Sequence, residues 1–74
     1  MAAKDPTLLK IGQNIRKARV ARAWSQEELA LKCGVHRTYV GSVERGEYNI
    51  TILTLRKITK TLRITIQDAI IGIS

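Results

Sequence analysis

The chain has 74 residues, and the 45% that are apolar suffice for one hydrophobic core, so a single domain over residues 1–74 is expected. No apolar run approaches the roughly 18 residues of a membrane span. The amino terminus also lacks the apolar stretch of a secretory signal, so we expect a cytoplasmic protein. The net charge of +7 favours a polyanionic partner, either nucleic acid or an anionic membrane.

Two helices are expected in the first half of the chain. Asp5 is placed as an N-cap before a proline, and the helix it starts should fade near residues 23–24. Its apolar stripe consists of Leu8, Ile11, Ile15 and Ala18. Ser25 and Glu28 match a capping box, and Gly34 is placed for a left-handed stop, which predicts a second helix over 26–33.

A third helix should begin near His36 and run to about Arg45, with Gly46 after it. Gly41 lies in its interior, where glycine costs about 1 kcal/mol relative to alanine. We therefore expect a close approach of another helix or of DNA at that position.

Two shorter segments follow. Thr51 can cap a fourth helix over 52–62, and Thr65 can cap a fifth over 66–71. The β-branched tail is also typical of a strand, but a lone strand would have nothing to pair with. The sequence therefore predicts an all-α fold with five helices.

Residues 25–46 have the pattern of a helix-turn-helix, two short helices joined by a tight turn at Gly34. The second helix of such a pair enters the major groove of DNA with its outward face. Arginine can donate two hydrogen bonds to guanine, and threonine and serine can contact other base edges. We therefore predict base readout by Arg37, Thr38 and Ser42.

Other polar residues flank this helix and are predicted to contact the DNA backbone. Residues 1–23 hold six basic residues against one acidic residue, a net charge of +5, whereas residues 24–74 hold seven against five, a net charge of +2. Helix N-termini also attract phosphate groups. The predicted backbone contacts are Gln26, His36, Tyr39, Arg45, Asn49, Arg16 and Lys17, and Tyr48 lies in the same region.

Arg19 and Glu44 fall near inward-facing stretches of the first and third helices, where either charge alone would be costly to bury. We predict that they form a structural ion pair between these helices.

The segment WSQEELALKCGVHRTYVGSVERGEYNITILTLRKITKTL resembles the lambda-repressor-like helix-turn-helix family, which includes phage repressors and Cro. Within that family it resembles the controller proteins of restriction–modification systems, over about residues 9–71. One departure is Ala23-Trp24, where the family often has glycine and leucine.

The resemblance implies five helices, with the middle pair reading DNA. It places Gln26 and Tyr39 beside the backbone, turns Arg37, Thr38 and Ser42 toward bases, and pairs Arg19 with Glu44. It further implies control of the protein's own gene and of an endonuclease gene. A dimer is expected to bind a near-palindromic operator. Whether dimers pair into a tetramer on DNA and whether RNA polymerase is a partner stay open.

The isoleucines of the tail exceed the needs of one small core, so we predict that the 66–71 helix lies in a dimer interface. The interface residues would be Ile66, Ile70, Ile71 and Ile73. The alternative is that the tail covers only its own core.

No catalytic residue, metal or cofactor is expected. The single cysteine, Cys33, and the single histidine, His36, are too few for a metal site. No catalytic triad or phosphate-binding loop is present, so we predict that the protein is not an enzyme. An antitoxin, a phage Cro-like repressor and, more remotely, a cationic membrane-active protein stay open as alternatives.

Overall fold

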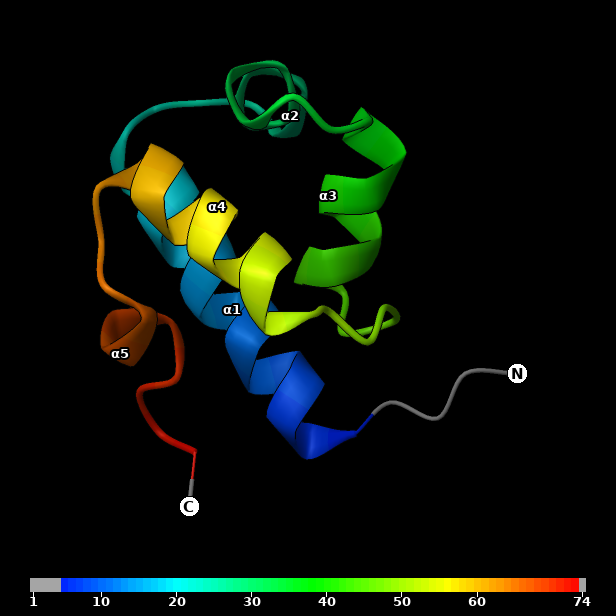
Figure 1. Cartoon of the computed structure of the whole chain (residues 1–74), viewed down its shortest axis with the longest axis vertical. Helices are drawn as coiled ribbons and strands as arrows, with labels where there is room; N and C mark the ends of the chain where they lie inside the picture. Colours follow the sequence, from blue (N-terminus) through cyan, green and yellow to red (C-terminus); the bar gives the residue numbers. More distant parts are fainter. Residues whose placement is uncertain (1–4, 74) are drawn as a thin grey trace.

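The computed structural model describes residues 5–73. The predicted domain covers residues 1–74, so its residues 1–4 and 74 lie outside the described part. Within that range the chain forms five helices and no strand, which confirms the predicted all-α class (Figure 1). The helices are α1 (Pro6–Ala21), α2 (Gln26–Cys33), α3 (Arg37–Glu44), α4 (Ile52–Leu62) and α5 (Ile66–Ala69). No helix in this part of the chain is both long and apolar enough to cross a bilayer.

Local capping starts the helices where the sequence predicts. Asp5 accepts a hydrogen bond from the Thr7 N–H at 2.8 Å, and Thr51 accepts one from the Thr54 N–H at 3.2 Å. Ser25 and Glu28 form the reciprocal capping box, with both hydrogen bonds at 3.0 Å. These caps satisfy N–H groups that have no partner inside the helix.

The helix ends differ more from the predictions. α1 stops at Ala21, before the predicted residues 23–24, because Ala23 adopts a left-handed conformation with φ 58°. α5 stops at Ala69, two residues before the predicted position 71. α3 spans 37–44, one residue shorter than predicted at each end, because His36 is its N-cap.

The core lies between the helices, with α1 packed against α3, α4 and α5 and α2 packed against α3 and α4 (Figure 1). Ile15, Leu29 and Leu62 are completely buried there, from α1, α2 and α4. α1 also crosses the end of α3 at Gly12, where a Cβ atom would overlap the carbonyl oxygens of Val43 and Glu44. This close crossing fixes the position of α3 relative to α1.

Gly34 sets the angle between α2 and α3. It ends α2 with φ +71°, a left-handed conformation that glycine adopts without steric cost. The Val35 N–H then bonds back to the Ala30 carbonyl at 3.0 Å, which closes the turn.

The tail is held against α1. Asn14 Nδ2 donates to the carbonyls of Ala69 and Ile71 at 2.8 and 2.9 Å. Of the four tail isoleucines, Ile66 and Ile73 pack against the core, whereas Ile70 and Ile71 are 41% and 60% exposed. The tail thus covers its own core with one part and presents the other part to solvent.

Candidate nucleic-acid interface

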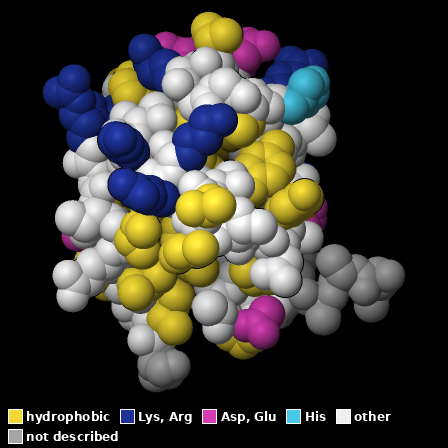
Figure 2. All heavy atoms as spheres, in the orientation of Figure 1, with side chains coloured by type: hydrophobic (Ala, Val, Ile, Leu, Met, Phe, Trp, Pro, Cys, Tyr) yellow, Lys and Arg dark blue, Asp and Glu magenta, His cyan; other side chains and the backbone are white. Residues whose placement is uncertain are grey.

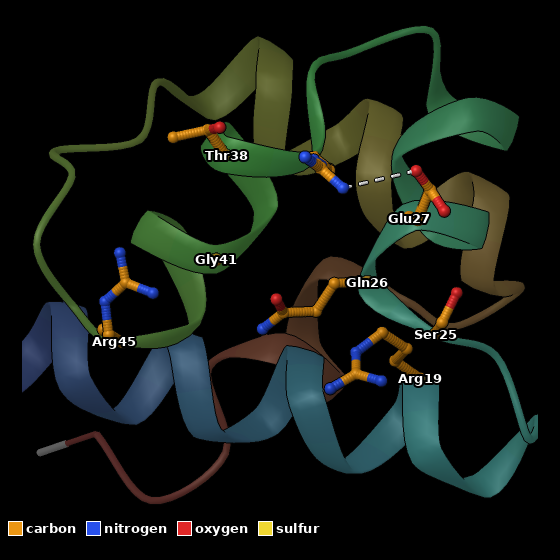
Figure 3. A pocket seen from close by; sticks show the side chains of 8 residues that line it. Arg19, Ser25, Gln26, Glu27, Thr38, Gly41 and Arg45 are labelled. Atoms are coloured by element: carbon orange, nitrogen blue, oxygen red, sulfur yellow. Dashed lines mark ion pairs between the residues drawn. The ribbon is translucent and has the colours of Figure 1, made fainter.

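An open groove lies between α2 and α3 (Figure 3). Side chains from α1, the start of α2 and the outward side of α3 converge on it. The lining residues are Arg19, Ser25, Gln26, Glu27, Arg37, Thr38, Gly41 and Arg45. The groove therefore brings together residues that the sequence predicted for base readout, for backbone contact and for the structural ion pair.

Arg19, which lines this groove, belongs to a buried ion pair. Arg19 Nε donates to Glu44 Oε2 at 2.6 Å and Nη2 donates to Oε1 at 3.0 Å, with side chains only 11% and 2% exposed. Arg19 Nη1 also donates to the Trp24 carbonyl at 2.7 Å, in the turn after α1. The hydrogen bonds to Glu44 raise the pKa of Arg19.

Gln26 is tied into the same network. Its Nε2 donates to Glu44 Oε1 at 3.0 Å, so one carboxylate joins α1, the start of α2 and the end of α3. Sequence reasoning placed Gln26 near the DNA backbone but missed this bond. The bond orients the amide at the start of α2, next to the backbone N–H groups of the first helical turn.

The residues predicted for base readout lie on the outward side of α3. Arg37 and Thr38 are exposed and line the groove, and Ser42 is partly buried one turn after Thr38. Arg37 Nη1 lies 3.6 Å from Glu27 Oε2, with both side chains about 70% exposed. Such a pair is weak in water, so Arg37 is free to exchange it for another acceptor.

Glu27 was not assigned to the site from the sequence. Its side chain faces the groove from the first turn of α2 (Figure 3). The only feature of the sequence that could have indicated Glu27 as a groove residue was its position next to Gln26. Helix periodicity within α2 does not show that α3 lies opposite Glu27.

Gly41 leaves room for two polar side chains. A Cβ atom there would lie 3.1 Å from Arg45 Nη1 and 3.5 Å from Gln26 Oε1. The predicted close approach thus involves side chains that line the groove, and not the backbone of another helix.

We expect a Gly41→Ala variant to be more stable yet to bind DNA less well. Alanine in a helix interior is favoured by about 0.5–1 kcal/mol, and the flexible end of Arg45 can move aside. That movement would displace one cation from the groove and lower DNA affinity about tenfold, the equivalent of ~1.5 kcal/mol. Thermal unfolding and fluorescence anisotropy with labelled duplex would measure the two effects. Unchanged DNA affinity would contradict this role for Arg45.

Three further backbone-contact candidates lie at the start of α3, within it and in the loop after it. His36 Nδ1 accepts a hydrogen bond from the Thr38 N–H at 3.1 Å, which leaves Nε2 as the N–H donor of an exposed ring. Tyr39 packs edge-on against Tyr48 with ring centroids 4.7 Å apart, and burial raises its pKa. Asn49 is exposed in the loop that follows.

The two α1 cations fall on different sides of their helix. Arg16 is four residues after Gly12 and shares the side that faces α3. Lys17 lies about 100° further round, on the side of Asn14, which bonds to the tail after α5. Neither residue lines the groove, and Arg16 lies on the side of α1 nearer to α3.

Within residues 5–73 there is no cluster of three or more potential metal ligands. Cys33 is buried among the apolar core residues. Apart from the Glu27 carboxylate, the groove is lined by hydrogen-bonding groups and cations, which suits an anionic ligand with polar edges.

Comparison with known proteins gives consistent matches. A helix-turn-helix family model matches residues 15–68. The chain is 39% identical over 61 residues to the control protein C.BamHI of Bacillus amyloliquefaciens, which covers 81% of this chain and 75% of that protein.

Solved structures agree. The restriction–modification controller protein C.AhdI of Aeromonas hydrophila matches with a TM-score of 0.80 and 40% identity, over 84% of this chain and 94% of that one. The controller protein C.Esp1396I, solved as a tetramer in complex with its natural 35 base-pair operator, matches with a TM-score of 0.78 and 36% identity, over 82% and 80%.

Proposed function

Because the chain belongs to the helix-turn-helix family and, within it, to the restriction–modification control proteins, we propose that it is a transcriptional regulator that binds double-stranded operator DNA. The observation that carries this proposal is the outward side of α3, where Arg37, Thr38 and Arg45 line one groove together with Arg19 (Figure 3). Arg19 is held there by its buried ion pair with Glu44. The proposed role is binding and regulation, without catalysis.

Base recognition is assigned to the N-terminal half of α3. Arg37 exchanges its weak contact with Glu27 for two parallel hydrogen bonds to the O6 and N7 atoms of a guanine. The hydroxyl groups of Thr38 and Ser42 face neighbouring base edges, and the Thr38 methyl group suits the methyl group of thymine.

Backbone contacts surround these residues. The first N–H groups of α2 and the Gln26 amide bind one phosphate, which favours the positive end of the helix dipole. The remaining contacts come from Arg45, which lines the groove, and from His36, Tyr39, Asn49 and Arg16. Lys17 is left out because it lies on the side of α1 that faces the tail.

We propose that two copies associate through the exposed part of the tail, at Ile70 and Ile71. A twofold dimer presents two recognition helices about 34 Å apart, which requires a near-palindromic operator. The related C.Esp1396I forms a tetramer on its operator, and we include pairing of dimers on DNA in this proposal. The proposal also includes a cytoplasmic location and contact with RNA polymerase. The genes controlled would be the protein's own gene and an endonuclease gene.

An Ile71→Glu variant should lose the dimer but keep its fold. Ile71 is 60% exposed in the single chain, so the substitution costs the monomer little. In a twofold interface it removes about 1.5–3 kcal/mol from each of two copies, so the dimer dissociation constant should rise at least about 100-fold. Sedimentation equilibrium measures this, and Leu31→Glu, at an 82% exposed leucine on α2, is the matched control. A dimer that survives the change at Ile71 would place the interface elsewhere.

The test of the proposed function begins with selection of preferred sites from a pool of randomised duplexes. The full chain should enrich a near-palindromic sequence at physiological salt. An Arg37→Ala variant should then lose about 1–3 kcal/mol of discrimination at one base pair in each half-site. A Gln26→Ala variant should instead weaken binding to all duplexes about equally. Failure to enrich any sequence would reject the proposal, and equal losses from both variants would reject the division of roles.

A further inference from the structure

A second group of cations lies away from the groove, on the outward side of α4 and the adjoining ends of α1 and α2. Figure 2 shows Lys and Arg side chains gathered over this region, with hydrophobic side chains lower on the same face. All six cations are exposed. We call this surface the second basic face: Arg22, Lys32, Arg56, Lys57, Lys60 and Arg63.

The fold of α4 determines which of its residues belong to this face. Leu55, Ile58 and Leu62 are buried and fix the inward side of the helix. Arg56, Lys57 and Lys60 are exposed cations of this helix, and Arg63 follows as its exposed C-cap. From residue 56 to residue 60 the helix rises about 6 Å at 1.5 Å per residue, close to the axial length of two phosphate steps on one DNA strand.

Contacts with α1 and α2 hold the remaining cations in place. Arg22 Nε donates to the Leu62 carbonyl at 2.7 Å, which attaches it to the end of α4. Arg22 Cζ and Lys32 Nζ lie 5.2 and 5.0 Å from the centre of the Trp24 ring. Cations over a tryptophan ring are attracted to it, so Trp24 orders both side chains before any ligand binds.

In the described part of the chain, no ion pair involves a cation of the second basic face. Within residues 5–73 the ion pairs join Arg19 to Glu44, Arg37 to Glu27 and Arg45 to Glu47. Two nearby acids are engaged elsewhere, because Glu28 and Asp68 accept hydrogen bonds in the caps of α2 and α5. One or two cations suffice to complement the carbonyl end of α4, whereas six converge here from three helices.

None of the six cations lines the groove between α2 and α3. Figure 3 looks into the groove and shows α4 behind α2 and α3. A twofold dimer would not cover the second basic face either, because its cations would then oppose their own copies. The face therefore stays open in an operator complex.

We infer that the second basic face binds the phosphate backbone of a second DNA segment, so that the protein bridges two duplexes. The inference depends on the proposed function only in that one duplex already occupies the groove. DNA supplies the regularly spaced negative charges that a row of cations along a helix complements. Binding at this face is electrostatic and independent of sequence.

A two-duplex experiment tests this inference. Full-length protein is loaded on an immobilised duplex that carries the selected site, and a fluorescent duplex without the site is then added. The wild-type protein should capture the second duplex. The Lys57→Gln/Lys60→Gln variant should capture it at least about tenfold less well while its affinity for the selected site changes less than about twofold. The slope of log affinity for the second duplex against log salt should fall by about 1.8.

Two controls distinguish binding at the second basic face from a nonspecific effect of the protein's net charge. The Lys10→Gln/Lys17→Gln variant loses the same two charges on α1 and should capture the second duplex as the wild type does. If the Lys57→Gln/Lys60→Gln variant captures the second duplex equally well, the inference is wrong. Capture of an acidic polypeptide in preference to DNA would also overturn it and indicate a protein partner. If the selection enriches no sequence, the proposed function has failed. The same capture assay with two random duplexes then still tests whether the second basic face binds DNA.

Discussion

A Glu44→Gln variant is expected to lose about 3–5 kcal/mol of its free energy of unfolding. A domain of this size has only about 4–11 kcal/mol in total, so the variant should be largely unfolded at modest denaturant concentrations. The reason is that glutamine keeps the shape of Glu44 but leaves the Arg19 guanidinium 11% exposed without a counter-charge. Urea denaturation followed by circular dichroism would measure the loss.

The loss should depend on burial and not on charge alone. Glu47 forms an ion pair with Arg45 at 3.1 Å in which the side chains are 37% and 54% exposed. A Glu47→Gln variant should therefore lose at most about 1 kcal/mol. The double variant Arg19→Met/Glu44→Met should lose less than the Glu44→Gln variant, because it leaves no unpaired charge in the core. If the Glu44→Gln and Glu47→Gln variants lose the same free energy of unfolding, the Arg19–Glu44 pair is not buried in solution.

A Gly12→Ala variant should lose at least about 3 kcal/mol, the upper end of what overpacking costs. The added Cβ atom would overlap the carbonyl oxygens of Val43 and Glu44, which are backbone atoms and cannot rotate away. α1 and α3 would have to separate, which would also strain the Arg19–Glu44 pair. The helix propensity of alanine offsets only about 1 kcal/mol of this cost.

Gly41→Ala is the matched control for Gly12→Ala, because both glycines are buried in helices. At Gly41 the nearest atom is the mobile end of Arg45 and not a carbonyl oxygen. The same chemical change should therefore stabilise the protein at one position and destabilise it at the other. If both variants are equally stable, the α1–α3 crossing is looser than the structure shows.

Helix starts and the fold class followed from local sequence, because a capping side chain bonds to N–H groups two or three residues away. Asp5, Ser25, Thr51 and Thr65 each begin a helix where predicted. Helix ends were less predictable. Ala23 has a left-handed φ, which its residue type does not indicate, because the conformation is held by bonds from the turn to the Arg19 and Val20 carbonyls.

The candidate site was predictable as residue types but not as geometry. The outward placement of Arg37 and Thr38 followed from the helix-turn-helix pattern and 3.6-residue periodicity. Whether Lys17 faced α3 depended on which side of α1 the other helices occupy. That choice belongs to packing, so the sequence alone could not separate Lys17 from Arg16 as a DNA contact.

What the sequence determined by itself, then, is the set of helices and the recognition face, because each depends on residues within one or two turns of one another. Tertiary structure alone decided the contacts between distant segments: the Gln26–Glu44 bond, Glu27 in the groove, and the meeting of Arg22, Lys32 and α4. Counted along the chain, the positive charge seemed concentrated before residue 24. Folding distributes this charge over two surfaces instead. Burial of apolar side chains fixes how the helices pack, and this packing determines which surface each exposed cation lies on.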